Sequence, residues 1–415
     1  MPELQEIKTT LSRIDKLERD IGLKQLQINS LLTITQAIND NVSAAGLYNM
    51  YKSFLNWEMG VKKMALIVKN DDDWECVSSI NAAADVYEKS IGPELLVFQR
   101  LHKITESDAF YLHEFDVVIP VFHKSLPIAY ALIGDCGDNE DIYSKIQFIT
   151  TITNVVAVAI ENKRLFKQQL EQERLKREIE LASEVQNMLI PSSFPKSSLY
   201  ELASIYKPHF NVGGDYFDYI PISPTRFVIC IADISGKGVA AALLMANFQA
   251  NLRNLTSTAE NLTELVQKLN ENVYLITRSD KFLTFFIAYI DLEERVLRYI
   301  NAGHTPPLCA MGDRITILKE GCTIIGAFDR INEIEEGKVN LKDETTLVLF
   351  TDGLTDLKNE SGQYFDEQQI KAFLKKNRNM HASDLNRSLM SEMESFNHEL
   401  RFPDDIAVLT CKLFI

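Results

Sequence analysis

The segment 211–238 constrains this chain most, because it places an acidic residue at one end of each of two apolar, strand-like runs. It reads NVGGDYFDYIPISPTRFVICIADISGKG. Asp215 stands directly before the first run, and Asp233 stands near the close of the second. Both aspartates have glycines nearby, and glycine lets a backbone approach a bound ion closely. An acid at a rigid strand end beside flexible backbone is a common way to hold a hard cation. The segment therefore predicts a metal site, provided that other strands supply more carboxylates.

Two later segments supply them. The run TTLVLFTDG ends on Asp352, and the run DDIAVLT begins with Asp404 and Asp405. A single aspartate at a strand end is usually a turn or capping residue, but this many in one region exceed what turns explain. Carboxylates held close together cannot all stay ionised without a cation between them. Oxygen ligands favour Mg²⁺ or Mn²⁺ over zinc. Two such ions about 3.5–4 Å apart hold and activate a water, the usual arrangement for phosphate ester hydrolysis.

Length and periodicity predict several domains. The chain has 415 residues, which favours two or three domains. We predict an N-terminal helix over 1–30, a mixed domain over 31–160 and a last domain over 191–415, in which strands alternate with two helix pairs. Residues 161–190 read as a charged helix that has no glycine or proline before Pro191. Its apolar stripe favours a dimeric coiled coil over a solvated spacer.

Composition narrows the class of protein. The formal net charge of −15 argues against non-specific binding to nucleic acid or to acidic membranes. The N-terminus has no apolar signal core, and we see no apolar run near the roughly 18 residues of a membrane span. The six cysteines form no C-x-x-C pair, so buried free thiols are expected rather than disulfides or zinc. We therefore expect a cytoplasmic protein.

From about Glu178 onward the chain resembles the PPM family of metal-dependent serine/threonine phosphatases, in its bacterial SpoIIE and RsbU branch. The motifs that carry the resemblance are, in order, ELASEVQNMLIP, VGGDYFDYI, ADISGKGVAAALLM, FLTFFIAYID, NAGHTPP, LFTDGLTD and DDIAVLT. The resemblance implies an α+β fold, an α/β/β/α sandwich of two antiparallel sheets flanked by helices.

The same resemblance implies a site with two Mn²⁺ or Mg²⁺ ions. Its ligands would be Asp215, Asp233, the backbone carbonyl of Ile234, Asp352 and Asp404. Asp233 would bridge the ions, and Asp233 and Asp352 would be the catalytic residues. Asp404 is preferred to Asp405 because it takes the first position of the family's two-residue motif. An activated water would displace serine or threonine from its phosphate directly, without a covalent phosphoenzyme. His304, in a turn rich in Gly and Pro, is expected to be structural.

Residues 30–160 resemble a GAF sensor domain. The resemblance rests on an entry helix, an antiparallel sheet with the terminal hairpin IPVF…PIAYALIG, and the exit helix FITTITNVVAVAIENKRLF. It implies a small-molecule ligand or a protein activator at this domain. His102, His113 and His123 are candidate ligand contacts, although surface or hydrogen-bonded roles are expected for them. The family further implies a homodimer through the linker, control of the metal site by linker rearrangement, and a phosphorylated STAS-domain anti-anti-sigma factor as substrate.

Two other functions fit part of the sequence. The triplet GGD before Tyr216 resembles the GGDEF signature of diguanylate cyclases, but the glutamate of that signature is missing. A degenerate phosphatase domain could also serve as a non-catalytic signalling adaptor. Cyclic di-GMP formation from GTP would favour the first alternative, and a lack of p-nitrophenyl phosphate hydrolysis with Mn²⁺ the second.

Overall fold

The computed structural model describes residues 2–70, 73–82, 92–135, 142–209, 212–342, 344–398, 402 and 404–414. The chain divides into two compact units, Met1–Gln172 and Glu173–Ile415. The division falls inside the linker predicted over 161–190. Each unit is described by itself below.

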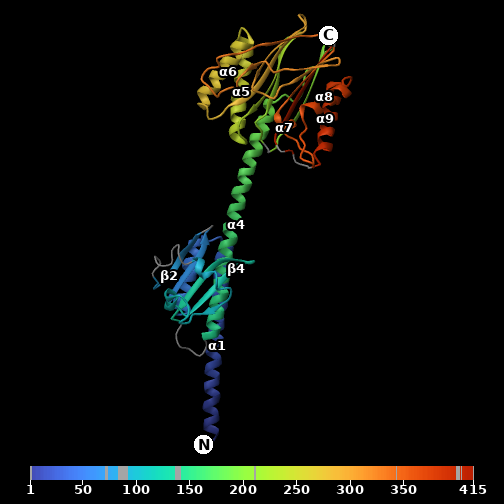
Figure 1. The fold of residues 1–415 in the computed structure, drawn as a ribbon. Coiled ribbons are helices and arrows are strands. Elements are labelled where there is room, and N and C mark those ends of the chain that lie inside the picture. The colour runs from blue at the N-terminus through green and yellow to red at the C-terminus, as the bar shows by residue number, and fades with distance from the viewer. Residues whose placement is uncertain are drawn as a thin grey trace. The chain divides into compact units, whose positions relative to one another are not determined.

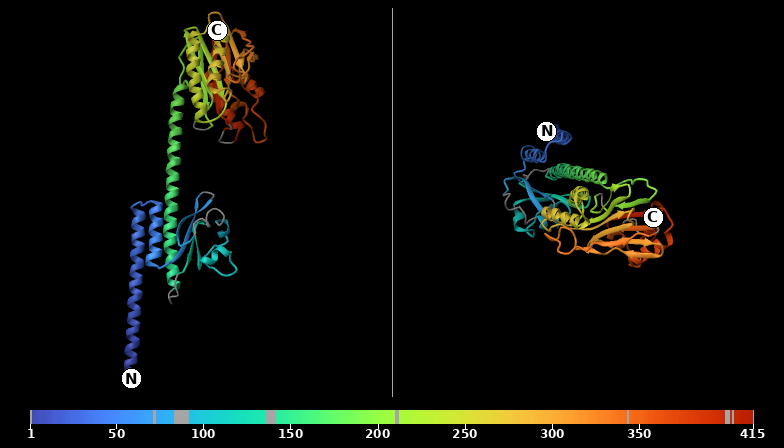
Figure 2. Two further views of the ribbon diagram at one scale, coloured as in Figure 1. Left: turned by 90° about the vertical axis from the view of Figure 1, so that its left-hand side faces the viewer. Right: turned by 90° about the horizontal axis from the view of Figure 1, so that it is seen from above.

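The N-terminal unit is a five-stranded antiparallel sheet covered on one face by helices (Figures 1 and 2). The sheet order is β2-β1-β5-β4-β3. Its strands are β1 (Lys63–Asn70), β2 (Asp73–Ile80), β3 (His102–Lys103), β4 (Val117–His123) and β5 (Leu126–Gly134). Its helical segments are α1 (Pro2–Asn39), α2 (Ala44–Ser53), a π-helix (Phe54–Glu58), α3 (Gly92–Leu95), a 3₁₀ turn (Phe110–Glu114) and the first part of α4 (Ile142–Leu189). Asp71 and Asp72, which follow β1 in the sequence, lie outside the described residues.

Helices α1, α2 and α4 share the larger of two apolar clusters with the sheet, and α3 and the 3₁₀ turn share the smaller one. Leu47 of α2 and Ile149, Ile152 and Val156 of α4 are buried in the larger cluster. The Tyr51 hydroxyl meets the Thr153 hydroxyl at 2.6 Å inside this cluster. The predicted N-terminal helix runs on to Asn39, and the predicted exit helix FITTITNVVAVAIENKRLF and the helix predicted over 161–190 form the single helix α4.

Helix α4 also differs from the sequence expectation about membrane spans. Within the part of the chain that the structure describes, its stretch Tyr143–Leu189 is long and apolar enough to cross a membrane by length and composition. A core helix passes the same test, and the apolar residues near the start of α4 pack in the core of the N-terminal unit.

The C-terminal unit contains two sheets. The first has the order β13-β10-β9-β8-β7, with β14 also paired to β10, and the second has the order β12-β11-β15-β16-β6. Pairing is antiparallel except between β10 and β13. The first-sheet strands are β7 (Tyr216–Ser223), β8 (Arg226–Ile234), β9 (Leu283–Asp291), β10 (Val296–Ala302), β13 (Gly321–Cys322) and β14 (Gly337–Asn340). The second-sheet strands are β6 (Tyr200–Lys207), β11 (Leu308–Met311), β12 (Arg314–Ile317), β15 (Thr345–Phe350) and β16 (Ile406–Leu413).

The two sheets pack face to face, and helices cover their outer faces (Figure 1). Helices α5 (Val239–Thr258) and α6 (Leu262–Thr277) pack on the first sheet. Helices α8 (Glu367–Asn377) and α9 (Ala382–Phe396) pack on the second sheet, and the short α7 (Asp352–Thr355) follows β15. Because both faces are covered, strands such as β8 are buried along most of their length. The prediction of an α+β fold with antiparallel sheets is therefore confirmed.

Among the described cysteines, Cys230, Cys309 and Cys411 are buried free thiols, as predicted, whereas Cys76 and Cys322 are half-buried. Cys136 lies outside the described residues. Strands β11, β13 and β14 are absent from the sequence-based prediction, because short strands have too few residues to establish a period. Strand β6 was missed because its sequence, YELASIYK, does not alternate strictly between apolar and polar residues.

An ion pair between the buried Asp218 and the half-exposed Arg253 fastens α5 to β7. The Asp218 side chain is fully buried and accepts two hydrogen bonds from the Arg253 guanidinium, at 2.8 and 2.9 Å. It also accepts bonds from the Tyr216 hydroxyl and the Tyr219 backbone N–H.

We predict that Asp218→Ala lowers the free energy of unfolding by about 3 kcal/mol, because it leaves the Arg253 charge and the Tyr216 hydroxyl without their buried partner. Urea unfolding of the full chain measures the change. Glu336→Gln, which removes the half-exposed pair with Arg298 at 3.5 Å, should stay within about 0.5 kcal/mol of wild type. Equal losses in the two variants would contradict the prediction.

Candidate metal centre

The ends of two strand pairs, one from each sheet, carry the predicted acids. Tyr216 of β7 pairs with Ala232 of β8, so Asp215 and Asp233 lie opposite each other at the same end. Phe350 of β15 pairs with Val408 of β16, so the residues after β15 and those before β16 also share one end. Antiparallel pairing has this consequence because one strand starts where its partner stops.

Hydrogen bonds join these two ends across the sheets. The Thr351 hydroxyl, just before Asp352, donates to Oδ2 of Asp215 at 2.7 Å. The backbone N–H of Gly214 donates to Oδ2 of Asp405 at 2.8 Å. Asp215 is only 2% exposed. The four acidic segments that are distant in the sequence are therefore neighbours in the fold.

Asp405 anchors the loop that leads into β7. Its Oδ1 accepts the backbone N–H of His209 at 2.7 Å, and its Oδ2 accepts that of Gly214. Both carboxylate oxygens are thus committed to backbone amides. The preference for Asp404 over Asp405 as a direct ligand stays a prediction.

Two glycines permit the close approach of these segments. A Cβ added to Gly353 would lie 1.8 Å from the carbonyl oxygen of Asp405, so no other residue fits where α7 meets the start of β16. A Cβ added to Gly214 would lie 2.7 Å from the carbonyl oxygen of Ile234. The predicted backbone ligand therefore lies directly beside the GGD segment.

The acids influence one another strongly. Burial and the neighbouring Asp352, Asp404 and Asp405 raise the pKa of Asp233 to about 7. Burial and Asp233 hold the pKa of Asp215 well above its usual range. Burial also raises the pKa of Asp352. A divalent cation would stabilise the ionised forms of all these groups.

The described side chains do not yet form a closed coordination shell. No three His, Cys, Asp or Glu side chains among them converge closely enough to hold one ion. Asp404, for example, accepts a hydrogen bond from Nζ of Lys237 at 2.8 Å. The donor set nevertheless fits a hard cation, because it consists of carboxylate and carbonyl oxygens. It also includes the buried Asp215, which lies opposite Asp233.

His304 lies in the protein interior, and both of its ring nitrogens have hydrogen-bond partners. Its Nδ1 accepts the hydroxyl of Thr284 at 2.7 Å, and its Nε2 donates to the carbonyl of Phe350 at 3.2 Å. Burial lowers the pKa of His304 to about 4, so the ring is neutral. Its bond to Phe350 holds the end of β15, two residues before Asp352.

Sequence reasoning missed three residues that hold the site in shape. Thr351 donates a hydrogen bond to Asp215, and Lys237 donates one to Asp404. Gln186 of α4 donates one to the backbone carbonyl of Gly213. Thr351, Lys237 and Gln186 lie inside motifs already noticed, LFTDG, SGKG and VQNMLIP, but only the fold shows what each contacts.

Comparison with known proteins supports the assignment of the C-terminal unit to a family of phosphatases. Residues 223–414 match the family described as Stage II sporulation protein E (SpoIIE). These residues form a SpoIIE-family domain. Phosphoserine phosphatase RsbU of Bacillus subtilis is 24% identical over 262 residues, which cover 63% of this chain and 73% of RsbU. Phosphoserine phosphatase RsbP of the same organism is 25% identical over 187 residues, which cover 44% of this chain and 46% of RsbP.

The fold of the SpoIIE-family domain is that of PP2C-type phosphatases. The SiaA-PP2C domain of Pseudomonas aeruginosa superposes with a TM-score of 0.52 at 19% identity, covering 59% of this chain and 98% of that domain. The family match begins at residue 223, so the assignment of Asp215 rests on its position beside Asp233. The prediction of a serine/threonine protein phosphatase of the SpoIIE and RsbU branch is confirmed at the level of the domain.

Proposed function

We propose that this protein is a metal-dependent phosphoserine/phosphothreonine phosphatase controlled by its N-terminal unit. The observation that supports the activity best is the meeting of four acidic segments from two sheets at one edge. The test is hydrolysis of p-nitrophenyl phosphate and of a phosphoserine protein by the full chain with Mn²⁺ or Mg²⁺. Activity without added metal after chelation, or formation of cyclic di-GMP from GTP, would contradict the proposal.

Each acid has a distinct task in this proposal. Asp233, Asp215 and the Ile234 carbonyl would hold one ion, and Asp233, Asp352 and Asp404 the other. When bound, Mn²⁺ or Mg²⁺ would neutralise the phosphate charge and supply an activated water. Asp405 fixes the loop before Asp215, and Thr351 orients the Asp215 carboxylate. Because a water attacks directly, the chain needs no nucleophilic cysteine or serine.

Helix α4 provides a direct contact for control of the site. Gln186 is 4% exposed. Its side-chain amide donates to the carbonyl of Gly213 at 2.7 Å and accepts the N–H of Gly213 at 3.2 Å. Gly213 lies two residues before Asp215, so a shift or rotation of α4 would move the backbone that carries this acid.

We predict that Gln186→Ala weakens Mn²⁺ binding about tenfold, because it leaves two buried backbone groups of the GGD segment without partners, at a cost of about 1–3 kcal/mol. Isothermal titration calorimetry measures the affinity. Asn187→Ala, on the exposed neighbour, is the matched control and should bind as wild type does. Unchanged binding in Gln186→Ala would argue against control through this contact.

The linker helix carries the proposed dimer interface. Phe166, Leu170, Leu175 and Val185 are at least half exposed. On α1, Ile14, Ile21 and Ile28 recur every seven residues and are 47–58% exposed. Such apolar stripes are typical of helices that pair with a second copy in a coiled coil.

We predict that the full chain sediments as a dimer, at twice its 47.2 kDa, and that Leu175→Glu shifts it to the monomer, because a charge in an apolar seam stays unpaired. Analytical ultracentrifugation at micromolar concentration measures the mass. Lys176→Glu, one residue further on the charged surface, should leave the dimer intact. A monomeric wild-type chain would remove this part of the proposal.

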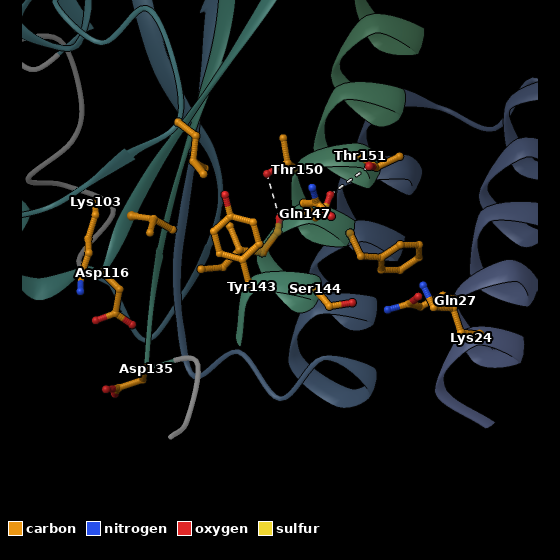
Figure 3. Close-up of a pocket in the computed structure, with 14 residues that line it drawn as sticks. Lys24, Gln27, Lys103, Asp116, Asp135, Tyr143, Ser144, Gln147, Thr150 and Thr151 are labelled. Atoms are coloured by element: carbon orange, nitrogen blue, oxygen red, sulfur yellow. Dashed lines mark hydrogen bonds between the residues drawn. The ribbon is translucent and has the colours of Figure 1, made fainter. Parts of the chain in front are cut away.

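The N-terminal unit is proposed as a GAF-like sensor, supported by its antiparallel sheet with helices on one face. A groove of about 1010 Å³ lies between this sheet and the helices. Figure 3 shows Lys103, Asp116 and Asp135 on the sheet side, Tyr143 and Gln147 on α4, and Lys24 and Gln27 on α1. This groove is a candidate entry for a small-molecule ligand or a protein activator.

The three histidines are poorer candidates for ligand contacts. His102 pairs with the carboxylate of Asp108 at 3.0 Å. The ring of His113 bonds to the backbone carbonyl of the same Asp108 at 3.0 Å. His102, His113 and His123 are not among the groove-lining residues.

For the substrate we propose a phosphorylated STAS-domain protein in a partner-switching pathway, acting in the cytoplasm. The similarity to RsbU and RsbP supports this proposal. Release of phosphate from such a protein, compared with unrelated phosphoproteins, tests it.

A further inference from the structure

Lys237 occupies an unusual place beside the acidic cluster. It lies in the loop between β8 and α5, and both flanking glycines have positive φ, 100° at Gly236 and 77° at Gly238. Residues other than glycine rarely adopt this conformation. The loop is further held by Ser235, whose N–H donates to the carbonyl of Phe282 and whose hydroxyl accepts the N–H of Phe282. The backbone thus presents Lys237 in a defined place.

The ammonium group of Lys237 contacts Asp404, a predicted metal ligand. Its Nζ donates to Oδ1 of Asp404 at 2.8 Å, and the same oxygen accepts the N–H of Asp405 at 2.8 Å. The side chains of Lys237 and Asp404 are 49% and 37% exposed. The contact is therefore open to solvent and can break without unpacking the core.

We propose that Lys237 is a built-in counterion of Asp404 that competes with divalent ions and so sets the affinity of the site for metal. This inference rests on the proposed metal-dependent function and deepens it. A cation that takes Asp404 as ligand must displace the ammonium group from Oδ1, and the displaced charge then lies close to the incoming ion. Both effects weaken metal binding relative to a site with a neutral residue at position 237.

The competition between Lys237 and a metal ion for Asp404 also explains why the described acids do not converge on one point. Lys237 bonds to Asp404, and backbone amides bond to Asp405, so both acids before β16 have internal partners before any ion arrives. The chain can therefore fold without metal, despite several acids at one edge. The lysine stabilises the metal-free protein and is exchanged for the ion when the site is completed.

The test is Mn²⁺ binding by the full chain, measured by isothermal titration calorimetry in Lys237→Met, Lys237→Arg and wild type. Lys237→Met keeps the length of the side chain and removes its charge, so we expect about tenfold tighter binding of Mn²⁺. Lys237→Arg keeps the charge and should bind within about twofold of wild type. Thermal unfolding gives a second readout, because Mn²⁺ should raise the melting temperature of Lys237→Met by more than that of wild type.

Lys281→Met is the matched control. The Lys281 ammonium lies by Gly236 of the same loop, 2.9 Å from where a Cβ on that glycine would be. The variant therefore removes an equal charge nearby without removing the bond to Asp404, and it should change the affinity less than twofold. Equal tightening in Lys281→Met and Lys237→Met would overturn the proposal in favour of a general field effect, as would unchanged or weaker binding in Lys237→Met.

The outcome is separable from the proposed activity, because binding is measured without substrate. If wild type and Lys237→Met both bind no Mn²⁺, the metal-dependent function fails and this inference fails with it. If wild type binds Mn²⁺ but releases no phosphate from any substrate, the role of Lys237 is still decided by the affinities.

Discussion

Asp233→Asn is expected to reduce phosphatase activity by about 10³-fold or more, equivalent to about 4 kcal/mol of transition-state stabilisation. Asp233 faces Asp215 across the β7–β8 pair and interacts with Asp352, Asp404 and Asp405. It is therefore the acid best placed to hold two ions at once. Asparagine keeps the shape of the side chain but loses the charge and one oxygen ligand. Initial rates with p-nitrophenyl phosphate at saturating Mn²⁺ measure the loss.

The same variant carries its own control against misfolding. Because the folded-state pKa of Asp233 is raised to about 7, the ionised carboxylate destabilises the metal-free protein at pH 8. Asparagine removes that penalty, so metal-free Asp233→Asn should unfold at the same or a higher temperature than wild type. Asp313→Asn, the same chemical change in an exposed turn, should leave the rate unchanged. Full activity in Asp233→Asn would rule out the proposed site.

Metal affinity is expected to depend strongly on pH. Below pH 7 the Asp233 carboxyl binds a proton that an incoming Mn²⁺ must displace. The apparent affinity for Mn²⁺ should therefore fall about tenfold for each pH unit below 7 and level off above about pH 7.5. Calorimetric titrations between pH 5.5 and 8, repeated in two buffers of different ionisation enthalpy, give the affinity and the protons released. A flat profile would contradict the raised pKa.

The stability of the metal-free protein should show the opposite trend. A carboxyl group whose folded-state pKa lies above its unfolded value contributes stability below the unfolded pKa, near 4, and loses it as pH rises through about 7. The pKa of the buried Asp215 is also raised, so its ionisation lowers the stability of the metal-free protein in the same direction. The gain in melting temperature on adding Mn²⁺ should thus grow from pH 6 to pH 8.

Much of the fold was predictable because its elements are long and periodic. The apolar runs at 227–234 and 345–350 are strands β8 and β15, and the helical spacing at 261–277 is helix α6. The predicted helix break at Pro191 lies just after the end of α4 at Leu189. The extent of α1 to Asn39 and the continuity of α4 were harder to predict, because uninterrupted helical periodicity contains no signal for a domain boundary.

The amino-acid sequence by itself predicted which residues would hold a hard cation. Aspartates at strand ends beside glycine have a chemistry that local spacing reveals, and seven motifs in order led to the right phosphatase family. Only the tertiary structure decided which of these acids have other partners. Hydrogen bonds such as those of Asp405 to Gly214, Asp404 to Lys237 and Gly213 to Gln186 join residues 27 to 191 positions apart. They depend on how two sheets and a helix meet in space, and no local pattern in the chain encodes that meeting.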